Sequence, residues 1–265
     1  MTPLRPRRRI FPAARLLAAA SLVLAACGSP PPEPAPSADP SPRPADRDQL
    51  AGLAAAAKDK RYVATYTWQT PDRPDRTVTA AVGTDGTWVV AVPAGILSGL
   101  ADVAIYSAPA GLFQCLLGPA AGTAGSRPDL GPLTPGCVRV TGLTPETDPR
   151  VQHLFTDWID PLVDRASALS VAAVPALDGA QGSCFSVESN SAALAPPVDP
   201  GVYCYTPDGL LTAARVSFGT FRLAGPVAAA PPSVTMPAPL VTRDPAPVTA
   251  PPPPPPPPPP VTPSP

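Results

Sequence analysis

The chain has 265 residues, of which 46 are proline and only 5% are aromatic, and its formal net charge is −1. This length allows one domain of ordinary size together with Pro-rich segments that cannot join a packed core. The absence of a basic excess argues against nucleic acid as a partner.

The first 26 residues have the three parts of a secretory signal peptide. Five arginines lie between Arg5 and Arg15, an apolar run covers residues 16–26, and small residues end that run. The run is too short to span a bilayer. Arg8 and Arg9 resemble part of a twin-arginine motif, but Pro12 stands where that motif has an apolar residue, so Sec export is favoured over twin-arginine export. The mature chain is therefore expected to be extracytoplasmic.

The end of this segment resembles the lipobox of bacterial lipoproteins, with the residues Leu24, Ala25, Ala26 and Cys27. In such proteins the cysteine receives a diacylglyceryl thioether and becomes the new N-terminus. We expect Cys27 to anchor the chain to the outer face of the cell membrane, because two acyl chains suffice for stable attachment. Removal of residues 1–26 leaves 14 basic and 20 acidic residues, a net charge of −6. Nucleic acid and anionic lipid headgroups are not expected partners of that surface.

Proline marks the domain boundaries, because it breaks both helices and strand ladders. Eight prolines lie between Pro30 and Pro44, and nineteen lie from Pro226 to the end. The expected parts are a signal peptide at 1–26, a Pro-rich tether at 27–45, a folded domain at 46–240 and a disordered Pro-rich tail at 241–265.

The tail contains ten successive prolines, which should form a polyproline II rod. Two interpretations of the tail remain open. It contacts the cell wall or a protein partner, or it is a solvated low-complexity end. The Ala- and Pro-rich composition resembles that of secreted proteins from high-GC actinobacteria.

The folded domain begins with a helix and continues with strands. Asp46 followed by Gln49 resembles a capping box and predicts a helix to about Lys60. Residues 62–68 alternate, which places Tyr62, Ala64, Tyr66 and Trp68 on one face of a strand. Turn signals then predict an antiparallel meander with further strands at 77–82, 87–92, 103–107, 112–117 and 137–141.

The hydrophobic period changes in the centre of the chain. Asp148 as N-cap and Pro149 as first residue predict an amphipathic helix to Ala166, with a kink at Pro161. Its apolar stripe includes Leu154, Phe155, Trp158, Ile159 and Leu162. Strands are predicted again at 169–174, 183–188, 201–206, 210–216 and 218–223.

Four cysteines remain once Cys27 is acylated, namely Cys115, Cys137, Cys184 and Cys204. An even number in an oxidising compartment predicts disulfides. Three pairings are possible. The order of the predicted strands favours Cys115 with Cys137 and Cys184 with Cys204. There is no CxxC pair and only one histidine, so no metal or cofactor is expected.

Motifs for catalysis are absent from the sequence, and we expect the protein not to be an enzyme. The histidine, His153, is expected to be a partly exposed helix residue without a chemical role. Residues 182–186 lack the second glycine of a nucleophile elbow. Asp157, Asp160 and Asp164 are interpreted as a solvated helix face.

The order of elements resembles that of the LolA/LppX-type (LprG-like) lipid-binding lipoproteins. The features that carry the resemblance are the lipobox, the helix before Tyr62, the long first strands, the central helical segment 149–166 and the late hairpin that ends at Val216. The resemblance covers about residues 46–240. It implies an α+β fold, with a curved antiparallel half-barrel sheet covered by an N-terminal helix and a central amphipathic helical plug. It also implies binding or shuttling of lipids, glycolipids or other acylated molecules in the cell envelope.

The candidate ligand-binding residues are the aromatic side chains of the first strands and the apolar stripe of the central helix. Two interpretations of these side chains remain open. Either they enclose a dry cavity for alkyl chains, or they fill the core of the domain. The alternative to lipid binding is a non-catalytic structural or interaction lipoprotein whose tail contacts the cell wall or a protein. The candidates are Tyr62, Tyr66, Trp68, Trp88, Leu154, Phe155, Trp158, Ile159 and Leu162.

We expect the protein in its own host to be processed before Cys27, acylated on that residue and recovered with the membrane fraction. Cell fractionation and mass spectrometry of the N-terminal peptide test this. An unprocessed chain in the cytosol with an unmodified Cys27 would contradict the anchor, the compartment and the class of ligand together.

Overall fold

The computed structural model describes residues 43–71, 73–122, 133–190 and 196–242. All of these residues belong to one unit, residues 40–265. The expected signal peptide, the lipobox with Cys27, most of the tether and the polyproline run lie outside the described residues.

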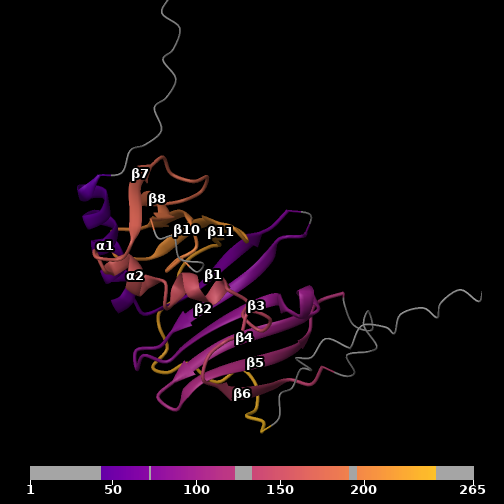
Figure 1. The fold of residues 1–265 in the computed structure, drawn as a ribbon. Coiled ribbons are helices and arrows are strands. Elements are labelled where there is room, and N and C mark those ends of the chain that lie inside the picture. The colour runs from indigo at the N-terminus through magenta and orange to yellow at the C-terminus, as the bar shows by residue number, and fades with distance from the viewer. Residues whose placement is uncertain (1–42, 72, 123–132, 191–195, 243–265) are drawn as a thin grey trace, which may run out of the picture. The chain divides into compact units, whose positions relative to one another are not determined.

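A large antiparallel sheet dominates this α+β fold (Figure 1). Eleven strands among the described residues pair in the order β6-β5-β4-β3-β2-β1-β11-β10-β9-β8-β7, and the sheet is not closed. The alternating patterns and turn signals of the sequence predict each of these strands to within a few residues. The strands are β1 (Tyr62–Gln69), β2 (Arg76–Val82), β3 (Trp88–Ile96), β4 (Ala101–Ala108), β5 (Gly111–Pro119), β6 (Gly136–Val140), β7 (Leu169–Val174), β8 (Ser183–Ser189), β9 (Gly201–Tyr205), β10 (Leu211–Val216) and β11 (Gly219–Leu223).

The first helix, α1 (Pro44–Asp59), begins two residues before the expected start. The predicted capping box is wrong, because Arg43 occupies the N-cap and Pro44 the first turn, where a missing N–H costs nothing. Asp46 instead accepts a hydrogen bond from the backbone N–H of Ala173 on β7, at 3.0 Å. Its carboxylate therefore joins the helix to the sheet.

The central segment is not the single helix that the periodicity predicts for residues 149–166. It consists of a 3-10 helix, η3 (Val151–Phe155), and a five-residue helix, α2 (Ile159–Val163). The break lies at Thr156, whose hydroxyl donates to the carbonyl of Gln152 at 2.9 Å and whose backbone is not helical. Pro161 lies inside the first turn of α2, where its missing N–H has no helical acceptor. A further short 3-10 helix, η1 (Leu97–Gly99), follows β3.

The main core lies between the sheet and the helices. The predicted alternation of β1 is confirmed, because Tyr62, Ala64, Tyr66 and Trp68 are all buried on one face. This face packs against α1, η3 and α2, and the ring of Tyr66 lies 4.8 Å from that of Phe155.

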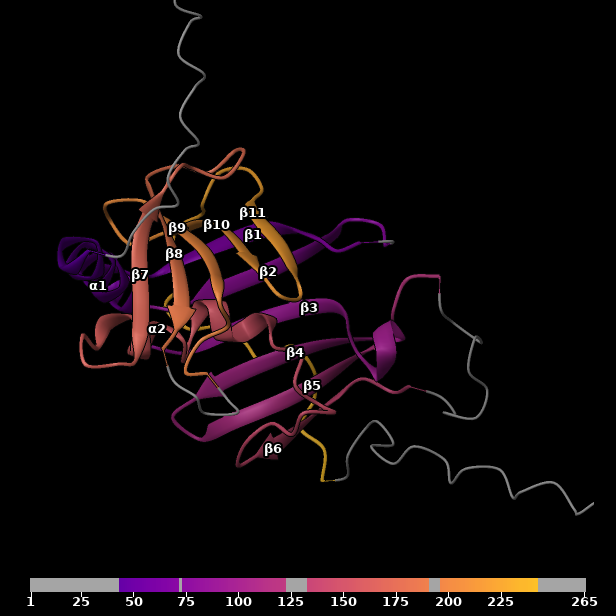
Figure 2. The ribbon, with the colours of Figure 1, turned by 45° about the horizontal axis from the view of Figure 1, so that its top comes forward.

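The opposite face of the sheet is covered by residues 226–241, drawn in yellow behind β2 to β6 (Figures 1 and 2). Val234, Met236 and Ala238 pack there in a second apolar cluster with Tyr106 and Phe113. Leu240 forms a parallel bridge with Cys137 on the edge strand β6. This C-terminal segment therefore covers both a face and an edge of the sheet.

Both predicted disulfides are confirmed. Cys115 lies directly opposite Cys137 on β5 and β6, and Cys184 lies directly opposite Cys204 on β8 and β9. All four residues are buried on the face away from the helices, in the two smaller apolar clusters. Each disulfide thus fixes the register of one strand pair.

Replacing Cys184 and Cys204 together by alanine should lower the free energy of unfolding by about 3 kcal/mol, because the bridge closes a loop with a sequence separation of 20. Urea unfolding of the wild type and of the double variant measures the difference. Thiol labelling of the unreduced mature protein is the companion measurement. Modification of two or more of the four cysteines would contradict the pairing.

Candidate ligand-binding cleft

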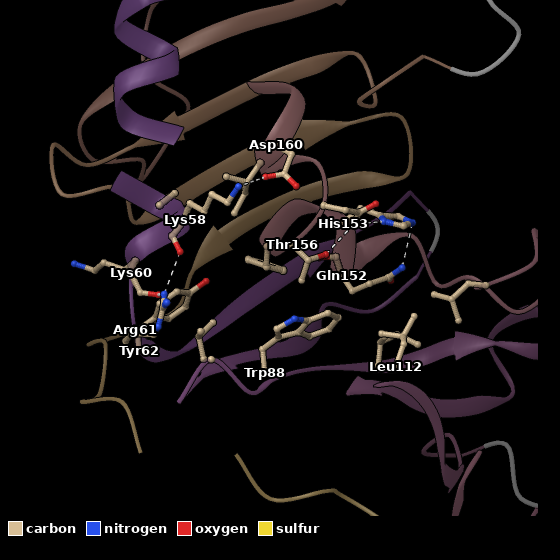
Figure 3. Close-up of a pocket in the computed structure, with 18 of the residues that line it drawn as sticks. Lys58, Lys60, Arg61, Tyr62, Trp88, Leu112, Gln152, His153, Thr156 and Asp160 are labelled. Carbon is tan, nitrogen blue, oxygen red and sulfur yellow. Dashed lines mark hydrogen bonds and ion pairs between the residues drawn. The ribbon is translucent and has the colours of Figure 1, made fainter. Parts of the chain in front are cut away.

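A cleft of about 560 Å³ lies between the sheet and the segment that contains η3 and α2 (Figure 3). This volume falls within the range of about 300–1,000 Å³ that is typical of small-molecule sites. The end of α1 and the residues that follow it form one end of the cleft.

The floor of the cleft is a row of cross-strand neighbours. Val82 lies opposite both Tyr62 on β1 and Trp88 on β3, and Ser107 on β4 lies opposite both Trp88 and Leu112 on β5. Residues directly opposite each other in an antiparallel sheet share a face. Four apolar side chains from four strands, those of Tyr62, Val82, Trp88 and Leu112, therefore lie in one line along the cleft.

Phe155 and Ile159 line the cleft from the covering segment. Its polar lining divides into two groups. Lys58, Lys60 and Arg61 lie at one end, and Gln152 and His153 lie at the other (Figure 3). The apolar floor, with Trp88, lies between them, and Thr156 of the covering segment lies above this floor (Figure 3).

Four of the nine predicted candidates line this cleft, namely Tyr62, Trp88, Phe155 and Ile159. Four others, Tyr66, Trp68, Leu154 and Leu162, are buried in the main core and do not line it. Trp158 is partly buried and stacks on the ring of His153, with ring centroids 5.3 Å apart.

Sequence patterns alone did not identify Val82, Ile105 and Leu112 as lining residues. Each belongs to a predicted strand, but its place on the floor depends on the pairing register. The turn after Val82 is the sequence signal that could have indicated this register. In the structure the N–H of Gly83 donates to the carbonyl of Thr87 at 2.8 Å, and this hydrogen bond sets Val82 opposite Trp88.

Two of the three cations at one end of the cleft are paired with carboxylates. Lys58 forms an ion pair with Asp160 at 2.7 Å, and this hydrogen bond raises the pKa of Lys58. Lys60 pairs with Asp208, and its ammonium group points away from the cleft in Figure 3. Arg61 donates to the backbone carbonyls of Lys58 and Lys60, each at 3.0 Å. Lys58 and Lys60 are therefore neutralised by carboxylates, whereas Arg61 has neutral carbonyl partners and keeps its positive charge at this end.

His153 lies at the other end and is held between two carboxylates. Its Nε2 is 2.8 Å from Asp148 and its Nδ1 is 2.6 Å from Asp157. Asp148 also accepts from the backbone N–H of Arg150 at 2.8 Å and from the side-chain amide of Gln152 at 2.7 Å. Asp148 thus connects the start of η3 to the imidazole ring.

Burial alone would lower the pKa of His153, but the hydrogen bonds and charges of Asp148 and Asp157 outweigh it and raise that pKa to about 9. Burial likewise acts to raise the pKa of each carboxyl, but the hydrogen bonds from His153 and from the other donors, together with the imidazolium charge, outweigh burial, so both carboxyl pKa values are lowered. At neutral pH the cluster is therefore an imidazolium between two carboxylates. Both ring nitrogens are donors with acceptors in place, so neither can take a proton from a nucleophile.

The sequence prediction missed this arrangement, because it treated His153 as a residue without a role and Asp157 as part of a solvated face. The spacing of four residues between His153 and Asp157 is the signal that could have indicated the pair. The sequence pattern predicts Asp148 as a helix cap, and Asp148 does bind a backbone N–H at the start of η3. Its second role, toward the imidazole, could not be inferred from a capping pattern.

His153 is the chain's single histidine, so one imidazole signal in the NMR spectrum reports its titration. We expect a midpoint at about pH 9, and a lower midpoint in Asp157→Asn. Because the folded pKa lies above the unfolded value, the stabilisation is complete below about pH 6.5 and is lost as the pH rises to about 9. Below about pH 4 it also declines as the carboxylates become protonated.

His153→Gln should therefore be less stable than the wild type by at most about 3 kcal/mol near pH 6, with a difference that shrinks toward pH 9. Chemical denaturation at several pH values measures this difference. A wild-type midpoint near pH 6.5, or a difference in stability that does not change with pH, would contradict the charged cluster.

No helix among the described residues is long and apolar enough to cross a membrane. Within the same ranges, no three His, Cys, Asp or Glu side chains form a group that could hold a metal ion. Comparisons of the chain with protein-family models, with curated proteins and with solved structures found no match.

Proposed function

We propose that this chain is a membrane-anchored extracytoplasmic lipoprotein that binds or shuttles lipids, glycolipids or other acylated molecules. The observation that carries the proposal is the apolar floor of the cleft, a row of side chains from β1, β2, β3 and β5 beneath a short covering segment. The acyl chain lies along this row, and the polar head lies toward an end of the cleft.

The dimensions of the floor suit an acyl chain. Neighbouring strands lie about 4.8 Å apart, so the row from β1 to β5 is roughly 19 Å long. Each CH₂ group that leaves water contributes about 0.8 kcal/mol to binding. Trp88 and Leu112 are partly buried, so an alkyl chain can still cover them.

The sheet and its covering segment correspond, in this proposal, to a curved half-barrel and its plug. The open antiparallel sheet and the packing of Phe155 on Tyr66 support this view. The resemblance to LolA/LppX-type lipoproteins gives the same order of elements, and it is the reason for placing an acylated ligand between the two layers.

Acylation of Cys27 would hold the domain at the membrane, where acylated molecules are found. Two buried disulfides suit the oxidising compartment outside the cytoplasm. We take the function to be non-catalytic, because His153 is engaged on both ring nitrogens. No cofactor is needed for this function.

A second candidate is a structural or interaction lipoprotein with a filled core. It is favoured by the burial of Tyr66, Trp68, Leu154 and Leu162 in the core rather than along the cleft. In that case the Pro-rich tail would contact the cell wall or a protein partner. Ligand binding by the cleft distinguishes the two candidates.

Leu112→Trp should weaken binding of the fluorescent fatty acid cis-parinaric acid by about tenfold or more, because the larger ring occupies the floor of the cleft. The mature polypeptide from residue 28 is suitable for this titration, since every described element lies within residues 43–242. Fluorescence enhancement of the fatty acid measures the affinity.

The matched control is Leu117→Trp, a change of the same size on the same strand. Leu117 packs in the apolar cluster on the opposite face, so its replacement should change the affinity by no more than about twofold. Absence of fatty-acid binding by the wild type, or equal weakening by both variants, would contradict an acyl site in the cleft and favour the filled-core candidate.

A further inference from the structure

The side chain of Gln152 is a buried amide in the lining of the cleft. The residue is only 2% exposed. Its Nε2 donates to Oδ1 of Asp148 at 2.7 Å. Its Oε1 is buried and has no hydrogen-bond partner within the part of the chain that the structure describes.

The orientation of this amide is fixed by its neighbours. Turning it over would place Oε1 against the carboxylate of Asp148, so that two acceptors would face each other. It would also leave Nε2 as a buried donor without an acceptor. Nε2 of Gln152 also lies 3.1 Å from Nε2 of His153, but that ring nitrogen directs its proton to Oδ2 of Asp148, at 2.8 Å. The nitrogen of Gln152 therefore faces Asp148, and the oxygen is left without a donor.

A buried acceptor without a donor is unfavourable, and such groups are rare in folded proteins. Here the unpaired atom belongs to a residue that lines the cleft. A ligand that brings an O–H or N–H group to this point restores the missing hydrogen bond. This hydrogen bond forms only when the ligand is bound, so it contributes to the affinity and to the selectivity of binding.

The charges around Gln152 decide which polar groups suit this end of the cleft. One imidazolium between the carboxylates of Asp148 and Asp157 leaves one net negative charge. A phosphate or carboxylate would bring further acceptors and further negative charge. A hydroxyl is a donor without charge, and an amine is a donor that is also attracted by the cluster.

We propose that Oε1 of Gln152 accepts a hydrogen bond from a hydroxyl or amine in the head group of the bound amphiphile, so that the cleft selects donor-bearing heads over anionic ones. This inference rests on the proposed acyl site and adds the chemistry of the head group to it. At the opposite end of the cleft Lys58 and Lys60 are paired with carboxylates, and the charge of Arg61 lies at that end, away from Gln152 (Figure 3).

Three ligands with chains of the same length test the inference by displacement of cis-parinaric acid from the mature polypeptide. Laurate has an anionic head, monolaurin has hydroxyls, and dodecylamine has an ammonium group. We expect monolaurin and dodecylamine to bind the wild type about tenfold more tightly than laurate, which corresponds to about 1.4 kcal/mol. A preference for only one of the two identifies the donor as a hydroxyl or as an amine.

Gln152→Leu and Gln152→Met keep a side chain of similar size but remove the acceptor. In both variants the preference for monolaurin over laurate should fall by several-fold, whereas dodecylamine keeps the part of its preference that comes from the net charge of Asp148, His153 and Asp157. Urea unfolding of each variant is the folding control, because Gln152 itself lines the cleft, and Gln152→Met is a second variant in case Gln152→Leu fails to fold.

The outcomes separate the two proposals. Equal affinity of the wild type for the three ligands overturns the head-group inference and leaves the acyl site standing. A preference for monolaurin over laurate that persists undiminished in both variants also overturns it, because the acceptor would then lie elsewhere. If none of the three ligands displaces the probe, the acyl site itself fails and the head-group inference fails with it.

Discussion

A sheet that does not close leaves unpaired backbone groups along its two edge strands and two faces that need cover. In this protein the first and last described segments supply much of that cover. Asp46 of α1 accepts the N–H of Ala173 on the edge strand β7, and the backbone next to Leu240 pairs with Cys137 on the edge strand β6. The helices lie on one face and residues 226–241 on the other. The strands alone would expose edges that invite pairing with other chains, so the fold depends on these two segments.

The cleft follows from the small size of the cover on the helical face. The segment from η3 to α2 is held at its ends, by the ion pair of Arg150 with Asp199 at 2.6 Å and by hydrogen bonds from Arg47 to the carbonyls of Pro161 and Leu162 at 2.9 and 2.7 Å. Between these points Phe155 reaches the core beside Tyr66. Two helices of five residues cannot cover a sheet of this width, and Val82, Trp88 and Leu112 remain partly exposed beside them.

Much of the fold can be predicted from the sequence, because alternation and turn residues are local signals. They predict the strands, and the order of the strands then indicates the disulfide pairing. The covering segment cannot be predicted in the same way. Its apolar residues recur at helical spacing, yet the hydroxyl of Thr156 bonds back to the carbonyl of Gln152 and a regular helix ends there. Similarly, Val82 and Leu112 become cleft residues only through the register of several hairpins, and His153 gains its charge only where the chain places Asp148 and Asp157 against it.

Asp148 connects the stability of the cover to the recognition chemistry of the cleft. Its carboxylate holds the N–H of Arg150, the imidazolium of His153 and the amide nitrogen of Gln152. The first two interactions fix a segment that lacks regular helical hydrogen bonds, and the third turns the amide oxygen of Gln152 away from the carboxylate. The unpaired acceptor is therefore a consequence of how the cover is held rather than an isolated defect. If His153 loses its proton, Asp148 loses its strongest donor, so the charge of one imidazole supports both the position of the cover and the orientation of the amide beside the ligand.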